Sequence, residues 1–100
     1  MTLMTIEWSC FAMEDRTGIF DYIEQYDPTA AVTVDERIME QTQKLERFPD
    51  FGRPGRVEGT RELVVNNTPF IIAYCIRKDA VLILRILHGA RSWPDLLPER

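Results

Sequence analysis

The sequence predicts a two-layer α+β domain in which a pair of antiparallel helices covers an antiparallel sheet. Three short runs rich in β-branched and aromatic residues follow one another between residues 61 and 88, with only tight turns between them. Two runs with apolar residues at helical spacing precede them, between about residues 9 and 47. The links between the strands leave no room for a crossover helix, so these strands should form a three-stranded meander.

The strands of the meander are marked by their composition and by the turns between them. Val64 and Val65 belong to the first strand, residues 70–76 to the second and residues 81–87 to the third. Asn66-Asn67 and Lys78-Asp79 supply the turn chemistry.

Alternation along the third strand sorts its side chains onto two faces. Leu82, Leu84 and Ile86 form a uniformly apolar face, which we expect to pack against the helices. Arg85 lies on the other face, which we expect to be open to solvent, a partner or a substrate. In the second strand periodicity does not settle which set joins the core: Phe70, Ile72, Tyr74 and Ile76, or Ile71, Ala73, Cys75 and Arg77.

The N-terminal half predicts one strand and a helical hairpin. Residues 3–8 alternate weakly and indicate a short first strand, and Ser9 can cap the helix that follows, which extends to about Tyr26. Asp27-Pro28 ends this helix, because proline disfavours helical geometry in the residue before it. The same pair can cap and open a second helix of about residues 29–47. The short link makes the two helices antiparallel neighbours.

The remaining segments are rich in glycine and proline. Residues 48–60 hold three glycines and two prolines and predict a loop without regular structure, with Arg53 and Arg56 at its tip. Residues 89–100 contain Gly89, Pro94 and Pro98 and predict an irregular tail, which Trp93 should anchor by burial.

Composition limits the classes of protein that fit. One hundred residues, 45% of them hydrophobic, are enough for one domain spanning residues 1–100 with a single core. There is no apolar run of about 18 residues and no signal-peptide pattern at the start, so we expect a cytoplasmic protein without membrane contact. Cys10 and Cys75 lie far apart in the sequence, so we expect reduced thiols, no metal site and no cofactor.

Charge is distributed unevenly along the chain. Residues 1–50 carry eleven acidic groups against four basic ones, and residues 51–100 carry five acidic groups against eight basic ones. Ten of the twelve cationic residues are arginines, which favours planar contacts with carboxylates or phosphates. An isoelectric point near 4.9 argues against nucleic-acid binding by the surface as a whole.

Three segments carry a family resemblance: residues 15–31 (DRTGIFDYIEQYDPTAA), 46–65 (ERFPDFGRPGRVEGTRELVV) and 70–94 (FIIAYCIRKDAVLILRILHGARSWP). With the order of elements, they resemble the RelE/ParE superfamily of bacterial type II toxins over nearly the whole chain. The resemblance implies the toxin fold of that superfamily, a cognate antitoxin and a role in growth arrest or plasmid stabilisation.

The superfamily divides into two branches with different mechanisms. ParE-like members poison DNA gyrase, and RelE-like members cut messenger RNA on the ribosome. RelE-like toxins have a basic cluster after the last strand, and residues 88–91, HGAR, replace it here. The sequence RILH at residues 85–88 is closer to that of ParE-like chains. We therefore expect gyrase poisoning without enzymatic chemistry. The alternatives are a ribosome-dependent endoribonuclease and an inactive toxin-like interaction domain.

The resemblance also assigns candidate site residues. The target-binding candidates are Arg53, Arg56, Arg61, Arg85 and Arg91. The antitoxin-binding candidates are Phe70, Ile72, Tyr74 and Trp93, with the groove beside the helical hairpin. If the chain is a nuclease, Arg61 and Arg85 would stabilise charge and His88 would move protons. Structural alternatives remain open, because His88 can end a core face and Arg61 can pair with Glu62 or a helix carboxylate.

Overall fold

The computed structural model describes residues 2–90 and residue 93. The elements follow the order β1 (Thr5–Trp8), α1 (Cys10–Glu24), α2 (Pro28–Lys44), β2 (Arg53–Pro54), β3 (Arg61–Val64), β4 (Phe70–Arg77) and β5 (Ala80–His88). The strands form one mixed sheet in the order β1-β5-β4-β3-β2, in which β1 runs parallel to β5 and the other neighbours are antiparallel. The predicted α+β architecture is confirmed, and β1 extends the meander by pairing with its last strand.

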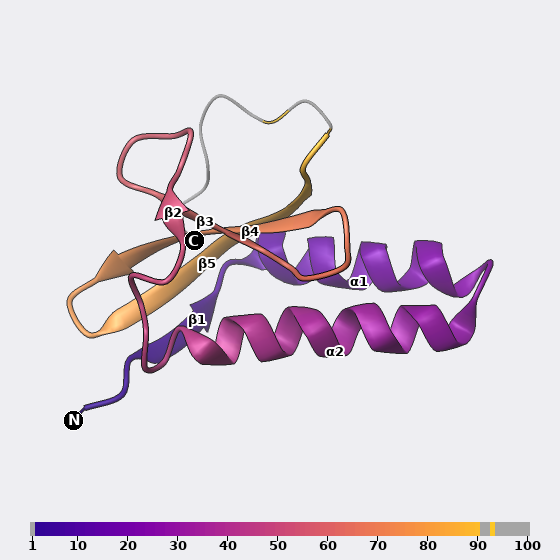
Figure 1. The fold of residues 1–100 in the computed structure, drawn as a ribbon, viewed down its shortest axis with the longest axis horizontal. Coiled ribbons are helices and arrows are strands. Elements are labelled where there is room, and N and C mark those ends of the chain that lie inside the picture. The colour runs from indigo at the N-terminus through magenta and orange to yellow at the C-terminus, as the bar shows by residue number, and fades with distance from the viewer. Residues whose placement is uncertain (1, 91–92, 94–100) are drawn as a thin grey trace.

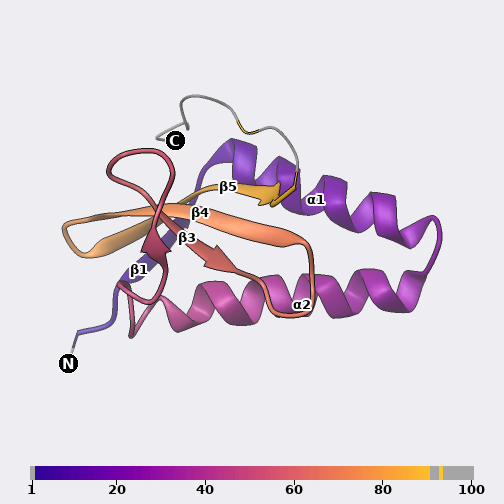
Figure 2. The same cartoon turned by 45° about the horizontal axis from the view of Figure 1, so that its top comes forward.

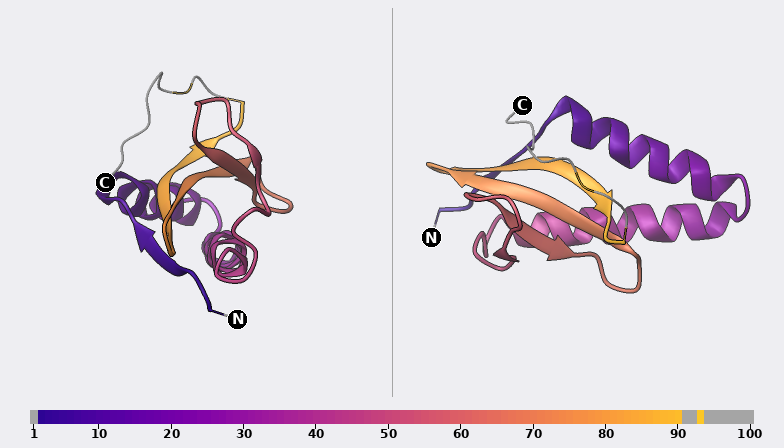
Figure 3. Two further views of the ribbon diagram at one scale, coloured as in Figure 1. Left: turned by 90° about the vertical axis from the view of Figure 1, so that its left-hand side faces the viewer. Right: turned by 90° about the horizontal axis from the view of Figure 1, so that it is seen from above.

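Both helices lie on the same face of the sheet. They run antiparallel to one another, and the turn that joins them projects past the ends of the strands (Figures 1 and 2). The loop between β2 and β3 lies on the side of the sheet away from the helices (Figure 3). This arrangement leaves two separate surfaces that could bind another molecule, one beside the helices and one at the loop.

The predicted helix caps are confirmed. The Ser9 hydroxyl accepts a hydrogen bond from the Ala12 N–H and donates one to the carbonyl of Leu84, so the cap also attaches α1 to β5. Asp27 accepts from the Ala30 N–H, and Pro28 occupies the first turn of α2. Each cap thus fixes where its helix leaves the preceding segment.

The predicted faces of β5 were wrong in part, because a β-bulge shifts the alternation. Ala73 pairs with Arg85 while Tyr74 pairs with Ile83, which leaves Leu84 as the extra residue. The side chains packed against the helices are therefore Val81, Ile83 and Ile86. Leu82 and Leu84 are buried in a separate cluster with Cys75. Only Ile86 of the predicted face joins the core beneath the helices.

The structure shows which side chains of β4 join the core. Ile72 and Tyr74 are fully buried in the core that includes Ala12, Ile38 and Leu45 of the helical half, and Phe70 packs against it. Ile72 and Tyr74 are among the predicted antitoxin-binding residues, but neither exposes any surface in the chain itself.

The segment of residues 48–60 is more ordered than expected. Arg53 and Pro54 form the short strand β2, which pairs with Glu62 and Arg61 of β3. The prediction of no regular element was therefore wrong for these two residues. Among the described residues, no helix is long and apolar enough to cross a lipid bilayer.

Candidate functional site

One buried carboxylate holds the two arginines of the loop. Glu62 is only 4% exposed. Its Oε2 accepts hydrogen bonds from the Arg56 backbone N–H at 2.7 Å and from Arg56 Nε at 3.2 Å. Its Oε1 accepts from Arg53 Nη2 at 3.3 Å and from Arg56 Nη2 at 3.5 Å. The side chains of Arg53 and Arg56 nevertheless remain 56% and 44% exposed. The acid is covered, and both arginine side chains are about half exposed.

Two opposing effects act on the pKa of Glu62. Burial raises it, but the hydrogen bonds from Arg56 and Arg53 lower it by more, so the pKa lies below its ordinary value of 4.5. The carboxylate is therefore charged at neutral pH, and its one negative charge is paired with the two positive charges of Arg53 and Arg56. We call Glu62, Arg53 and Arg56 the loop cluster.

The beginning of the loop is fixed by two side chains from the sheet. The Tyr74 hydroxyl donates to the Pro49 carbonyl and accepts from the Gly52 N–H, both at 2.8 Å. Arg61 Nη1 donates to the Gly52 carbonyl at 2.7 Å and to the Asp50 carbonyl at 3.3 Å. Burial raises the pKa of Tyr74, so its hydroxyl stays protonated and keeps both bonds. The loop is thus held in place without its own hydrophobic core.

Position 52 requires glycine because the sheet approaches it closely. A Cβ at this position would lie 2.7 Å from the Tyr74 hydroxyl oxygen and 2.8 Å from the Glu62 carbonyl oxygen. Both distances are too short for a carbon atom. The glycine at this position of the FGRPGR sequence (residues 51–56) is therefore explained by the packing of the loop on β3 and β4.

Arg85 was predicted on a face open to solvent, a partner or a substrate, but in the structure it pairs with a carboxylate of α1. Its Nε and Nη2 donate to the two carboxylate oxygens of Asp15 on α1 at 2.6 and 2.9 Å. Asp15 also accepts from the backbone N–H of Ile86 at 2.9 Å. The two side chains are only 25% and 16% exposed, so this bidentate pair joins α1 to β5. The hydrogen bonds to Asp15 raise the pKa of Arg85, which keeps it charged.

The structure does not bring the three nuclease candidates into one centre. Among the described residues, Arg61 is engaged by the loop and Arg85 by Asp15. The His88 ring packs edge-on against Phe70 with centroids 5.8 Å apart, and its Nδ1 accepts from the Ala90 N–H. None of the contacts described joins one of these three side chains to another. Arg91 lies outside the described residues.

Trp93 lies against Arg56 of the loop cluster. The Arg56 guanidinium carbon lies 3.5 Å from the centroid of the Trp93 ring system. The indole Nε1 donates to the His88 carbonyl at 3.2 Å. The predicted anchoring role of Trp93 therefore involves a cation–π contact and a hydrogen bond as well as burial.

A groove of about 740 Å³ lies between α1 and the end of the sheet. Glu14 of α1 and Asn67 of the turn between β3 and β4 are among the polar residues that line it. Its apolar lining includes Ile19, Tyr22, Ile23, Val34, Phe70 and Leu87. Phe70 is the one member of the predicted antitoxin-binding set that lines this groove.

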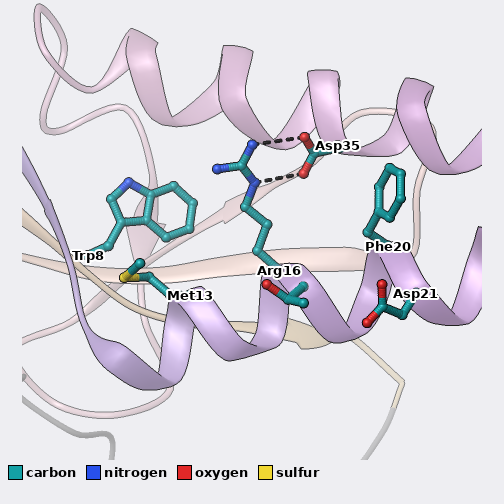
Figure 4. A pocket seen from close by; sticks show the side chains of 7 residues that line it. Trp8, Met13, Arg16, Phe20, Asp21 and Asp35 are labelled. Atoms are coloured by element: carbon teal, nitrogen blue, oxygen red, sulfur yellow. Dashed lines mark hydrogen bonds and ion pairs between the residues drawn. The ribbon is translucent and has the colours of Figure 1, made fainter.

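A smaller hollow of about 380 Å³ lies between the two helices. Arg16 of α1 donates to both carboxylate oxygens of Asp35 on α2 at 2.7 and 2.8 Å, with Trp8 and Phe20 on either side (Figure 4). The hydrogen bond from Arg16 lowers the pKa of Asp35, and the same bond raises the pKa of Arg16. Arg16 and Asp35 satisfy one another, and this pair joins the two helices.

Sequence reasoning missed Asp15 as the partner of Arg85, and it considered Glu62 only as a partner of Arg61, whereas Glu62 pairs with Arg53 and Arg56. Asp15 pairs with Arg85, which lies 70 residues further along the chain, so no local pattern names that partner. The partners of Glu62, Arg53 and Arg56, lie nine and six residues before it, across the loop. The signal for Glu62 was its place between Arg61 and three apolar residues of a strand, where a charge requires a partner. Among the described residues, no group of three or more His, Cys, Asp or Glu could hold a metal ion.

Comparison with known proteins agrees with this fold and with the bacterial toxin class. Residues 6–93 match the family described as "ParE toxin of type II toxin-antitoxin system, parDE". The chain is 29% identical to a solved chain titled "Chromosomal ParDE TA system from P. aeruginosa", with a TM-score of 0.78 over 84% of this chain and 94% of that one.

Two curated relatives are similar over most of their length. One is "Putative toxin Y4kP" of Sinorhizobium fredii, 41% identical over 97% of this chain and 100% of the relative. The other is "Toxin RelE2" of Caulobacter vibrioides, 37% identical over 86% of this chain and 96% of the relative.

The fold and these similarities define a toxin of the RelE/ParE superfamily. More narrowly, the chain belongs to the ParE toxin family and is the toxin of a type II toxin-antitoxin system. Such a toxin has an antitoxin as its partner.

Proposed function

We propose that this toxin arrests growth by poisoning DNA gyrase in the cytoplasm, and that the loop cluster with Trp93 is its target-binding surface. Membership of the ParE family supports the gyrase target. The observation that carries the choice of surface is the contrast in exposure within the loop cluster. A covered carboxylate fixes two arginine side chains that remain about half exposed, which suits binding with little ordering cost.

The environments of the nuclease candidates also favour binding over cleavage. In-line attack on a phosphate requires cations that can be directed at the developing charge, with a proton acceptor nearby. Arg85 is committed to Asp15, and Arg61 is committed to the carbonyl groups of the loop. His88 packs on Phe70. The target-binding role therefore rests on Arg53 and Arg56, whereas Arg61 and Arg85 support the structure.

The antitoxin, on this proposal, occupies the groove between α1 and the turn before β4. An amphipathic segment could place apolar side chains against Tyr22 and Phe70, and a basic residue beside Glu14. Tyr22 is 61% exposed in the chain alone, which leaves apolar surface for a partner to cover. The groove and the loop cluster have no lining residue in common. Binding of the antitoxin and binding of the target can therefore be tested separately.

A second candidate function is ribosome-dependent cleavage of messenger RNA. The similarity to a protein named "Toxin RelE2" favours it. In that case Arg61, Arg85 and His88 would have to leave the contacts described above and meet at the substrate.

The test is a gyrase assay with the purified chain, alone and with its antitoxin. We expect trapped cleaved DNA or loss of supercoiling, reversed by the antitoxin. A parallel translation reaction should show intact message. Cleaved message without an effect on gyrase would establish the second candidate. No effect in either reaction, with the antitoxin still bound, would indicate an inactive interaction domain.

A further inference from the structure

Arg56 contacts two different groups through two different parts of its guanidinium. The nitrogen atoms at its edge donate to the Glu62 carboxylate, with Nε at 3.2 Å and Nη2 at 3.5 Å. Its central carbon lies 3.5 Å from the centroid of the Trp93 ring. A planar group can donate from its edge and stack through its face at the same time, and an ammonium group cannot.

Trp93 is fixed at a second point by the end of the sheet. Its Nε1 donates to the carbonyl of His88, the last residue of β5. The side chain remains half-buried. Trp93 therefore connects the end of β5 to the loop, and through Arg56 to the buried carboxylate on β3.

Stability alone does not account for a buried acid at position 62. A buried ion pair contributes little to stability compared with apolar residues of similar volume. The partners of Glu62 are half-exposed arginines, whose heads would be well solvated without it. A buried carboxylate in this position sets the orientation of the two guanidinium groups, and the contacts described for the indole include one of them, that of Arg56.

We propose that Glu62 and Arg56 are positioning residues that hold Trp93 in a fixed orientation. Trp93 with the exposed arginine heads then forms one rigid contact surface, which fits a target protein that offers carboxylates beside an apolar side chain. The inference rests on the proposed function, because it says how the target-binding surface is built.

The first experiment measures the orientation of Trp93 without any target. The chain has two tryptophans, so Trp8→Phe leaves Trp93 as the single reporter. In that background Arg56→Lys should raise the acrylamide quenching constant of Trp93 at least about twofold, because the stacking is lost. Arg53→Lys is the matched control, since Arg53 also donates to Glu62 but has no stacking contact with Trp93 among those described. Equal quenching in Arg56→Lys and the parent would overturn the proposal.

The second experiment measures activity as the toxin concentration that gives half-maximal trapping of cleaved DNA by gyrase. Arg56→Lys and Trp93→Ala should each raise this concentration about tenfold. Arg37→Lys is the control and should change it less than about twofold, because Arg37 lies on α2, is partly exposed, and makes a long hydrogen bond of 3.4 Å to the Asn67 carbonyl, outside the loop cluster. The affinity of Arg56→Lys for the antitoxin should equal that of the parent. A mobile Trp93 with unchanged activity, or an equal loss of antitoxin affinity, would overturn the proposal.

The two proposals fail in different ways. If the parent chain does not act on gyrase, the proposed function fails. Growth arrest per amount of folded toxin then takes the place of the gyrase readout, and the same variants are compared. Glu62→Gln provides a further variant, because it keeps an acceptor for the Arg56 N–H. It should give increased quenching and reduced growth arrest, and a parental value of either would contradict the positioning role.

Discussion

Two arginine–carboxylate clusters in this toxin use the same chemistry with opposite exposure. In the pair of Asp15 and Arg85, both side chains are largely covered, and they join α1 to β5. In the loop cluster, Glu62 is covered while Arg53 and Arg56 remain about half exposed. The first arrangement stabilises a junction within the fold, and the second displays fixed cations to solvent. Burial of both partners, not the presence of an ion pair, separates a structural arginine from one available to a partner.

The largest expected effect comes from breaking the covered pair. Asp15→Ala leaves the Arg85 charge without its bidentate partner and removes the acceptor of the Ile86 N–H. We expect the free energy of unfolding to fall by about 3 kcal/mol. Urea unfolding followed by circular dichroism measures this change. A loss below about 1 kcal/mol would show that the junction does not depend on the pair.

The support of the loop gives the next effect. Tyr74→Phe removes the hydroxyl that donates to Pro49 and accepts from Gly52, and we expect a loss of about 1 to 2 kcal/mol. Hydrogen exchange at the Gly52 amide should accelerate more than exchange in the helices. Tyr22→Phe is the matched control, because Tyr22 is 61% exposed. Equal exchange at Gly52 in both variants would contradict the role of the Tyr74 hydroxyl.

Lowering the pH should remove the stability that the ionised Glu62 carboxylate contributes to the loop cluster. The pKa of Glu62 is below its ordinary value of 4.5 in the folded chain, so its carboxylate contributes stability that is present above that value. The contribution is lost as pH falls through the lowered folded pKa. The difference in urea midpoint between the parent and Glu62→Gln should therefore shrink between about pH 6 and about pH 3. A difference that is constant over this range would show that Glu62 is not ionised in the fold.

The smallest effect belongs to the pair between the helices. Arg16 and Asp35 are 36% and 27% exposed, so solvent screens their attraction. Asp35→Asn should cost about 0.5 to 1 kcal/mol, and the cost should shrink in about 1 M salt. Thermal unfolding at two salt concentrations measures both quantities. A cost as large as that of Asp15→Ala would contradict the link between exposure and strength.

Local chemistry made much of the fold predictable. The Ser9 and Asp27 caps and the proline at the start of α2 are sequence signals that act within one helical turn, and the structure confirms them. The bulge at Leu84 was not predictable, because both faces of β5 are apolar and a shift of one residue exchanges one apolar set for the other. The same ambiguity in β4 left open whether Ile72 and Tyr74 join the core, and the structure buries both.

The candidate site was predictable only as a set of residue types. The sequence pointed to Arg53 and Arg56 because a loop rich in glycine and proline exposes its tip. It could not separate them from Arg61 and Arg85, because the carbonyl groups and carboxylates that engage those two come from other segments. The pairing of Glu62 with both loop arginines depends on the return of the chain from β2 to β3, which no local pattern encodes.

The most direct test compares Glu62→Gln and Asp15→Asn with the parent in gyrase reactions at equal concentrations of folded protein. We predict that the parent traps cleaved DNA and that Asp15→Asn traps as much while being less stable. Glu62→Gln should need about ten times more protein for the same trapping, although its stability changes by less than about 1 kcal/mol. No trapping by the parent, or equal trapping by Glu62→Gln, would contradict this account.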